Sequence, residues 1–349
     1  MLDVPHGGSS NRPMQNAFII AEAGVNHNGS IDLALQLVDA AKASGADAVK
    51  FQTFRAERLA ARAAQKAAYQ ERTTASTESQ FQMLQRLELD VAAHRRLMDH
   101  CQQIGIQFLS SPFDMESADL LAEMNLPLFK VPSGEITNLP FLKHIARKGK
   151  PMIVSTGMST LGEVEEAVQV LRDAGATQLT LLHCVTEYPA PYDEINLRAM
   201  QTLKVAFGLP VGYSDHTPGI EIAVAAVALG AEVVEKHLTL DRALPGPDHH
   251  ASLEPREFAQ MVSSIRRVEA SLGNGIKRPV PCEVPNIAVA RKSVVAAQAL
   301  AAGHQLTAAD LEIKRPGNGL APKLLPALIG RTLRVSVREE ELLDWNHLA

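Results

Sequence analysis

Short apolar runs alternate with segments of helical period along most of the chain. From residue 18 onward, each apolar run of strand length precedes a segment whose apolar positions recur every three or four residues. The runs that we predict as strands cover residues 18–23, 46–52, 106–109, 127–131, 152–154, 179–183, 211–213 and 233–237. The predicted helices cover residues 31–44, 78–103, 115–124, 139–148, 161–174, 195–207, 218–230 and 256–272.

Eight strands, each followed by a helix, predict an α/β fold of the (β/α)8 TIM-barrel type. Residues 55–77 fit neither pattern, because they are polar and rich in alanine, and we expect an excursion over one end of the barrel. The alternative is an open, doubly wound sheet. The first predicted turn, at residues 23–29, lacks the GxGxxG fingerprint of a dinucleotide-binding sheet, which favours the barrel.

The pattern changes after residue 273. Glycine and proline are frequent in residues 273–285 and indicate a linker, and three short β-type pieces then follow at 293–296, 311–314 and 332–335. We therefore expect a flexible lead-in over residues 1–16, a barrel over 17–273, a linker over 274–289 and a small domain over 290–349. Because a domain of about sixty residues buries little core, it is expected to pack against the barrel or another subunit.

Composition narrows the classes of function. The net charge is -5 and no basic stripe is present, which argues against a nucleic-acid partner. No apolar run is long enough to cross a membrane, so no membrane partner is expected. The three cysteines are scattered and odd in number, and they form neither a disulfide framework nor a CxxC metal site. This cysteine usage predicts a reducing compartment, the cytoplasm.

Polar side chains follow the apolar residues at the carboxyl end of nearly every predicted strand. One such side chain means little, because strand ends border polar loops. A row of them at one rim of a barrel is typical of an active site. The row consists of Glu22, Lys50, Gln52, Ser110, Ser111, Lys130, Ser133, Glu135, Ser155, Thr156, His183, Ser214, Asp215, His216 and His237.

Two histidines in this row suggest a metal site. His216 and His237 stand at the ends of predicted strands that are neighbours in the chain, so one divalent ion could lie between them. A lone histidine more often satisfies a structural hydrogen bond. Two at matching strand ends favour a metal that polarises a carbonyl group as a Lewis acid.

The remaining groups suit an anion and a proton transfer. Lysine cations and serine hydroxyls bind phosphate or carboxylate oxygens, and the residues of this kind are Lys50, Lys130, Ser133, Ser155 and Ser214. Glu22 and Glu135 are candidates for proton transfer or for binding sugar hydroxyls. Asp248 lies just beyond the last predicted strand and is expected to enter the same site. His249 and His250 are interpreted as loop residues.

The segments that carry these residues closely resemble the sialic acid synthase family, and the resemblance extends from about residue 17 to the C-terminus. They are AEAGVNHNG at 21–29, VKFQT at 49–53, KVPSGE at 130–135, STGM at 155–158, GYSDHT at 212–217, EKH at 235–237, GPD at 246–248 and KRPGNG at 314–319. The resemblance implies a TIM barrel followed by an antifreeze-like (SAF) domain, assembled as a domain-swapped homodimer. It also implies condensation of phosphoenolpyruvate with an N-acetylated mannose-type sugar, giving a nine-carbon 2-keto sugar acid and phosphate.

The resemblance also assigns expected roles to individual residues. The metal, Mn2+ or Mg2+, would be held by His216 and His237. Phosphoenolpyruvate would be bound by Lys50, Ser111, Lys130, Ser133, Ser155 and Ser214. The sugar would be bound by Gln52, Tyr188 and Arg315, the last from the SAF domain of the partner subunit. The expected catalytic residues are Glu135, Glu22 and Asp248, with Glu22 also a sugar contact.

Two departures and two rival functions remain open. Ser111 stands where many relatives have threonine, and Thr186 stands where one branch has asparagine. Residues 61–89 resemble the legionaminic acid branch at least as well as the N-acetylneuraminate branch, so the sugar is either N-acetylmannosamine or 2,4-diacetamido-2,4,6-trideoxymannose. One rival is a metal-free aldolase with a Schiff base on Lys50 or Lys130. The other, a non-catalytic carbohydrate- or ice-binding module, leaves the barrel row unexplained.

Overall fold

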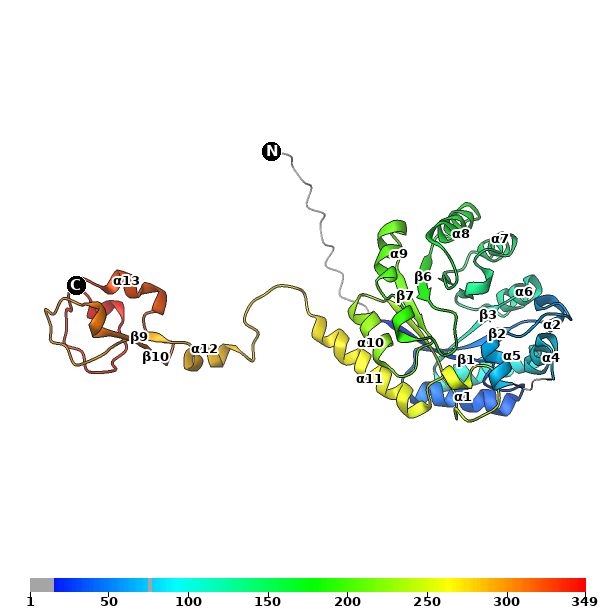
Figure 1. The fold of residues 1–349 in the computed structure, drawn as a ribbon, viewed down its shortest axis with the longest axis horizontal. Coiled ribbons are helices and arrows are strands. Elements are labelled where there is room, and N and C mark those ends of the chain that lie inside the picture. Colours follow the sequence, from blue (N-terminus) through cyan, green and yellow to red (C-terminus); the bar gives the residue numbers. More distant parts are fainter. Residues whose placement is uncertain (1–15, 75–76) are drawn as a thin grey trace. The chain divides into compact units, whose positions relative to one another are not determined.

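A computed structural model describes residues 16–74 and 77–349 as parts of two compact units, which divide in sequence between Gly273 and Asn274 (Figure 1). The expected lead-in falls outside the described residues except for residue 16. Residues 75–76 of the excursion also fall outside them.

The first unit contains an eight-stranded parallel sheet that confirms the TIM-barrel prediction. Its hydrogen-bonded order is β3-β2-β1-β8-β7-β6-β5-β4, and the two end strands, β3 and β4, lie against each other. All strand pairs between these ends are parallel. The strands are β1 (Phe18–Gly24), β2 (Ala48–Thr53), β3 (Gln107–Pro112), β4 (Phe129–Val131), β5 (Met152–Ser155), β6 (Leu179–Cys184), β7 (Val211–Asp215) and β8 (Val233–His237).

Helices pack around the outside of the sheet (Figure 1). They are α1 (Ile31–Ala43), α5 (Val91–Ile104), α6 (Met115–Glu123), α7 (Leu139–Ala146), α8 (Leu161–Asp173), α9 (Ala199–Phe207), α10 (Glu221–Ala228) and α11 (Pro255–Leu272). Helix α1 shows how the sequence sets such a helix. Its first turn is capped by Ser30, whose side chain accepts a hydrogen bond from Leu33 N, and the face with Leu37 and Val38 is buried.

The single helix predicted over residues 78–103 is wrong, because the structure divides it into α4 (Gln80–Leu87) and α5. The side chain of Asp90 accepts a hydrogen bond from Ala93 N and so begins a new helix. Just before it, Glu88 accepts a hydrogen bond at 2.6 Å from the backbone N–H of Ala56. That residue opens α2 (Ala56–Leu59), which together with α3 (Ala68–Thr73) lies within the predicted excursion.

The second unit has its own small core. It contains α12 (Val284–Ala290), the antiparallel pair β9 (Ser293–Ala296) and β10 (Leu311–Lys314), and α13 (Leu325–Leu328). Helix α12 lies in the segment predicted as a linker. The β-type piece predicted at 332–335 forms only isolated bridges, including Leu333 with Leu348. The apolar residues buried here, such as Leu306 and Leu328, form a cluster of this unit alone.

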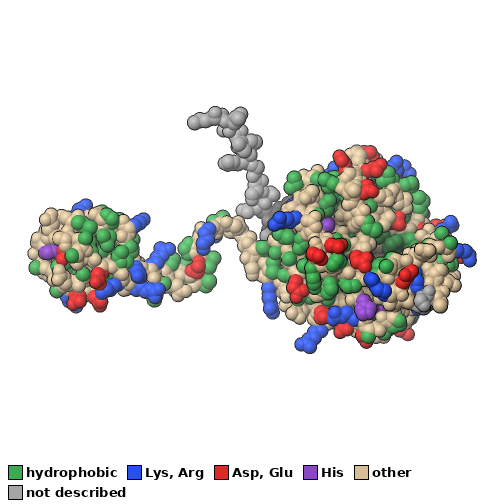
Figure 2. Space-filling view, in the orientation of Figure 1, with side chains coloured by type: hydrophobic (Ala, Val, Ile, Leu, Met, Phe, Trp, Pro, Cys, Tyr) green, Lys and Arg blue, Asp and Glu red, His purple; other side chains and the backbone are tan. Residues whose placement is uncertain are grey.

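The surface agrees with the charge balance of the sequence. On the face drawn in Figure 2, lysine and arginine side chains are interspersed with aspartate and glutamate. Within the described part of the chain, no helix combines the length and the apolar character that a membrane crossing requires.

Candidate active site

The inward-facing positions of the barrel strands form an apolar layer beneath a polar layer. The apolar layer is a separate buried cluster that includes Ile20, Ala48, Leu109, Ile153, Leu182 and Val233. Two residues further along the same strands stand Glu22, Lys50, Ser111, Ser155, Cys184 and Glu235. Residues i and i+2 of a strand face the same side, so each strand passes from apolar to polar on the inner face. The polar layer lies at the carboxyl ends, where a barrel active site forms.

Strand β7 contributes glycine to the apolar layer for a steric reason. A Cβ on Gly212 would lie 2.3 Å from the carbonyl oxygen of Val233 and 2.6 Å from Cδ2 of Leu182. Only glycine therefore lets β7 approach these neighbours. Two residues later, Ser214 enters the polar layer.

Four charged side chains form a buried cluster in the polar layer. Nζ of Lys50 lies 2.7 Å from Oε2 of Glu22 and 3.7 Å from Oε2 of Glu235. Nζ of Lys130 lies 3.0 Å from Oε1 of Glu235. All four side chains are at most 5% exposed. Because two cations face two carboxylates, the cluster is electrically neutral when both carboxylates are ionised.

Burial and pairing shift the pKa values within this cluster. Burial raises the pKa of Glu22 to about 7, although Lys50 acts to lower it. Burial would also raise the pKa of Glu235, but Lys130 and Lys50 bring it down to about 2. Glu235 is therefore the ionised partner of both lysines, whereas Glu22 titrates near neutrality.

Four serine hydroxyls line the same pocket as the lysines. Ser111 accepts a hydrogen bond from Lys50 at 3.1 Å, and Ser214 donates one to Glu235 at 3.2 Å. Ser133 accepts one from Gly157 N at 3.0 Å, and a Cβ on Gly157 would lie 2.8 Å from this hydroxyl. Among the residues that the structure describes, the buried Oγ of Ser155 has no hydrogen-bond partner. These hydroxyls can therefore serve a ligand that carries oxygen acceptors.

The two histidines meet across neighbouring strand ends, with ring centroids 5.4 Å apart. Nδ1–H of His216 donates a hydrogen bond to the carbonyl oxygen of Val185 at 2.6 Å, so in the neutral ring Nε2 is the acceptor nitrogen. Within residues 16–74 and 77–349, the buried Nδ1 of His237 finds no hydrogen-bond partner. Burial lowers the pKa of His237 well below its usual value, so this ring is neutral.

This arrangement fits one shared divalent ion. Two imidazole nitrogens bound to one ion place the ring centroids roughly 4.5–5.5 Å apart when the bonds are about 2 Å long. A neutral ring with a free nitrogen is the form that binds metals, and the bond from His216 to a backbone carbonyl fixes its tautomer. No group of three or more histidine, cysteine, aspartate or glutamate residues within the described chain is arranged to hold a metal. Ligand or water oxygens would have to complete the coordination.

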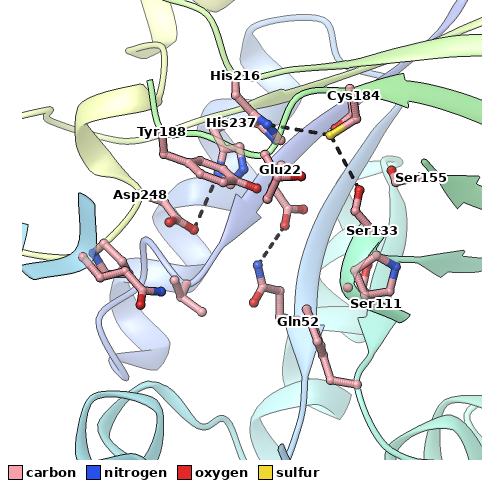
Figure 3. A pocket seen from close by; sticks show the side chains of 18 of the residues that line it. Glu22, Gln52, Ser111, Ser133, Ser155, Cys184, Tyr188, His216, His237 and Asp248 are labelled. Carbon is pink, nitrogen blue, oxygen red and sulfur yellow. Dashed lines mark hydrogen bonds and ion pairs between the residues drawn. The ribbon is translucent and has the colours of Figure 1, made fainter. Parts of the chain in front are cut away.

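Tyr188 and Asp248 complete the histidine side of the pocket. The ring of Tyr188 lies 4.1 Å from that of His216 and 5.6 Å from that of His237, measured between centroids. Oδ2 of Asp248 lies 3.9 Å from Nδ1 of His237. Figure 3 shows these groups on one side of the pocket and the hydroxyls of Ser111, Ser133 and Ser155 on the other. Gln52 donates a hydrogen bond at 3.2 Å to Glu22, which lies between the two sides.

One cavity of about 460 Å3 joins these groups. Of the fourteen residues to which the resemblance assigns a role, twelve line this cavity: Glu22, Lys50, Gln52, Ser111, Lys130, Ser133, Ser155, Tyr188, Ser214, His216, His237 and Asp248. Glu135 follows β4 in a short 3-10 turn, and its carboxylate accepts a hydrogen bond from Asn138 at 2.7 Å instead of lining the cavity. Arg315 belongs to the second unit, where Nε donates to the carbonyl oxygen of Ala290.

Several lining residues escaped the sequence analysis. Glu235 was missed although it stands two residues before His237 on the same inner face, so strand alternation could have found it. Cys184 occupies the equivalent position on β6. Tyr69 and Gln70 come from α3, and the Tyr69 ring lies 5.0 Å from that of Tyr188. No signal in the sequence places that short helix over the barrel.

Known proteins are similar to this chain in sequence over most of its length. A profile of the NeuB family matches residues 37–277, and a profile of the SAF domain matches residues 291–349. The chain is 52% identical to the N,N'-diacetyllegionaminic acid synthase of Campylobacter jejuni, over 95% of this chain and 99% of that protein. It is 45% identical to the Legionella pneumophila protein of the same name, over 99% of this chain and 96% of that protein.

A solved structure is similar as well. The N-acetylneuraminic acid (sialic acid) synthetase of Leptospira borgpetersenii aligns with a TM-score of 0.69 and 36% identity. The alignment covers 78% of this chain and 90% of that one.

Proposed function

We infer the reaction from one premise, that the chain belongs to the NeuB family and is a sialic acid synthase-type enzyme. The proposed reaction condenses phosphoenolpyruvate with an N-acetylated mannose-type sugar. The products are a nine-carbon 2-keto sugar acid and phosphate. The observation that carries the proposal is the single cavity in which two lysines and several serine hydroxyls face two paired imidazoles.

The sugar that we propose is 2,4-diacetamido-2,4,6-trideoxymannose, since two relatives that align over nearly the whole chain are N,N'-diacetyllegionaminic acid synthases. The cavity lining supports this choice. Besides the charged and hydroxyl groups, the cavity is lined by Val25, Leu59, Met83, Leu84 and Phe113. Apolar side chains favour the methyl groups of acetamido substituents and of a deoxygenated C6 over hydroxyl groups.

The metal would be held by His216 and His237, and Mn2+ and Mg2+ are the proposed ions. When bound, such an ion acts as a Lewis acid that makes the aldehyde carbon of the open-chain sugar more electrophilic. Ser133, Ser155 and the lysine cations would hold the phosphate and carboxylate of phosphoenolpyruvate in the same cavity. This placement would bring the methylene carbon towards the aldehyde.

The proposed reaction balances through three bond changes: a new C–C bond, a new C–O bond from water, and a broken C–O bond to phosphate. The methylene carbon of phosphoenolpyruvate forms the new C–C bond with the aldehyde carbon, and the aldehyde oxygen gains a proton. Water then adds at C2 and loses one proton. The C–O bond to phosphate then breaks while the new C2 hydroxyl gives up its proton, so that phosphate leaves with that proton and C2 becomes the ketone. Glu22, with a pKa raised to about 7 by burial, is suited to move one of these protons. Glu135 and Asp248 remain candidates for the same work.

The contacts of the lysines disfavour a Schiff base on Lys50. Burial alone would lower the pKa of Lys50, but Glu22 and Glu235 raise it above its usual value, so the amine stays protonated. A Schiff-base lysine must be neutral to attack a carbonyl. Burial does lower the pKa of Lys130, so that residue needs a direct chemical test.

The test of the proposed function is phosphate release from phosphoenolpyruvate with each of the two sugars. We expect kcat/KM to be about tenfold or more higher with 2,4-diacetamido-2,4,6-trideoxymannose than with N-acetylmannosamine, since apolar contacts of this size discriminate to that extent. A heavy oxygen isotope at the bridging position of phosphoenolpyruvate should appear in phosphate. Equal rates would reject the sugar assignment, and no release with either sugar would reject the reaction.

Treatment with a chelator distinguishes the proposed metal-dependent synthase from a Schiff-base aldolase. Activity should disappear on chelation and return with Mn2+, whereas borohydride plus substrate should leave the enzyme active. Covalent trapping of either lysine by borohydride would establish the aldolase instead.

Assembly and location complete the proposal. We propose a domain-swapped homodimer in the cytoplasm. The cytoplasmic assignment is supported by the cysteines, because Cys101, Cys184 and Cys282 are free thiols.

Arg315 provides a test of the swapped arrangement. Arg315→Ala is expected to raise KM for the sugar about tenfold or more while changing KM for phosphoenolpyruvate little, because one charged hydrogen-bond donor to the sugar is lost. Initial rates with one substrate varied at a time measure both constants. The control is Arg338→Ala. Arg338 lies in the same unit as Arg315 and donates a hydrogen bond to Glu341. Equal loss of affinity for both substrates would contradict the assigned role.

A further inference from the structure

We propose that the buried Asp215–Lys236 ion pair is a positioning device that holds the imidazoles of His216 and His237 in register for one metal ion. The inference rests on the proposed metal role of these histidines. It assigns a function to two charged side chains that do not line the active-site cavity and that the proposed reaction does not use.

The ion pair lies directly behind the histidine pair. Asp215 and Lys236 are register partners on the adjacent strands β7 and β8, and each immediately precedes one histidine. Nζ of Lys236 lies 2.8 Å from Oδ2 of Asp215, and both side chains are 0% exposed. Because side chains alternate along a strand, this pair faces the helices while Ser214 and Glu235 face the cavity.

The pair also fixes the backbone on the far side of His216. Oδ1 of Asp215 accepts hydrogen bonds from the backbone N–H of Thr217 at 2.9 Å and from its hydroxyl at 2.8 Å. Lys236 donates a second hydrogen bond, to the carbonyl oxygen of Thr217. His216 is therefore held between two residues that are both tied to the strand carrying His237.

Other bonds complete the restraint on each histidine. The carbonyl oxygen of His216 accepts a hydrogen bond from Ala190 N at 2.9 Å, and the His216 ring donates one to the carbonyl oxygen of Val185. The carbonyl oxygen of His237 accepts one from Leu253 N at 2.9 Å. Beyond the backbone pairing of β7 with β8, which ends at Asp215 and Lys236, the bonds of the Lys236 side chain connect the turn carrying His216 to the strand carrying His237. Their loss would let the two nitrogens move apart.

Stability alone gives a weak reason for such a pair. Removing two charges from water costs free energy, and an apolar pair of similar size is often as stable or more stable. Groups that hydrogen-bond metal ligands, in contrast, orient those ligands, and their loss typically weakens metal binding about 10–100-fold. The Asp215–Lys236 pair would act one step further out, through the backbone of Thr217. A positioning role and a merely structural role therefore predict different results for the same variant.

The test uses the full-length protein stripped of metal and measures Mn2+ binding from the electron paramagnetic resonance signal of free Mn2+. In the double variant Asp215→Leu/Lys236→Met, apolar side chains replace both charges, so no buried charge is left unpaired. We expect its Kd for Mn2+ to rise about tenfold or more. Its kcat should approach that of the parent protein at high Mn2+, and its melting temperature should change little.

Two further variants sharpen the result. Thr217→Val removes only the hydroxyl donor to Asp215 and should weaken Mn2+ binding by a smaller factor, which keeps the test valid if the double variant does not fold. Arg266→Met removes an ion pair with Asp47 that lies next to the amino-terminal end of β1, and it should leave the affinity for Mn2+ unchanged.

The outcomes are distinct. An unchanged Kd in the folded double variant, or in Thr217→Val when the double variant does not fold, overturns the positioning role and leaves the proposed reaction standing. Failure of the parent protein to bind Mn2+ overturns the metal role of the histidines and this inference with it. Weaker binding in the double variant but not in Arg266→Met supports the inference.

Discussion

His237→Ala is expected to lower kcat/KM for the condensation by ~10³ or more, with the fold retained, because a lost metal ligand removes the Lewis acid at the aldehyde. The side chain stands at the end of β8, and its Nδ1 makes no hydrogen bond within the described residues. No hydrogen bond of the fold is lost with that nitrogen. Phosphate release measures the rate, and circular dichroism with thermal unfolding measures the fold.

The matched control is His100→Ala on the outer helix α5. His100 pairs with Asp39 at 2.7 Å, away from the cavity lining, so its removal should leave the rate unchanged. Wild-type activity in His237→Ala, with metal still bound, would contradict the assignment of the metal site.

Lys50→Met is expected to lower kcat/KM for phosphoenolpyruvate by about 10³, because it deletes a buried cation that would bind the anion. It should also lower the free energy of unfolding by about 3–5 kcal/mol, since breaking a buried pair leaves a charge without its partner. The partners concerned are Glu22 at 2.7 Å and Glu235 at 3.7 Å. Steady-state kinetics and chemical denaturation measure the two effects separately.

The double variant Lys50→Met/Glu22→Gln distinguishes binding from folding. Removing the unpaired carboxylate should restore much of the lost stability but none of the affinity for phosphoenolpyruvate. A return of both would show that Lys50 acts only on the fold.

The single variant should also show a defined pH dependence. Without Lys50, the pKa of Glu22 rises above about 7, whereas in the unfolded chain it stays near 4.5. Between these values the folded state binds the extra proton, so stability increases as the pH falls. The stability deficit of Lys50→Met relative to wild type should therefore shrink between pH ~8 and pH ~6.

The barrel could be predicted because the apolar runs of the strands differ clearly from the three-to-four-residue period of the helices, and because the strand–helix unit recurs eight times. The strand ends could be predicted for the same reason. Lys50 faces inward because it stands two residues after the inward-facing Ala48. Since all eight strands are parallel, the inward-facing residues at their carboxyl ends meet at one rim of the barrel. Helix boundaries that depend on a single capping residue were harder to predict. The Asp90 cap that separates α4 from α5 depends on one side-chain hydrogen bond within a continuous helical pattern.

Contacts between distant segments could not be predicted in the same way. Tyr69 reaches Tyr188 from a six-residue helix without buried residues of its own, so its position depends on tertiary packing and not on period. Lys236 was not among the predicted site residues. Its burial against Asp215 follows from the register of β7 with β8, which only the folded sheet defines.

The buried cluster of Glu22, Lys50, Lys130 and Glu235 affects how phosphoenolpyruvate reaches the pocket. Two lysines would ordinarily attract an anion from a distance, but Glu235, together with Glu22 where it is ionised above pH ~7, compensates them at 2.7–3.7 Å. Beyond a Debye length of about 8 Å, little net field from this cluster remains to guide diffusion. Selection of phosphoenolpyruvate would then occur after entry, by exchange of carboxylate contacts for substrate contacts, and the association rate should vary little with ionic strength.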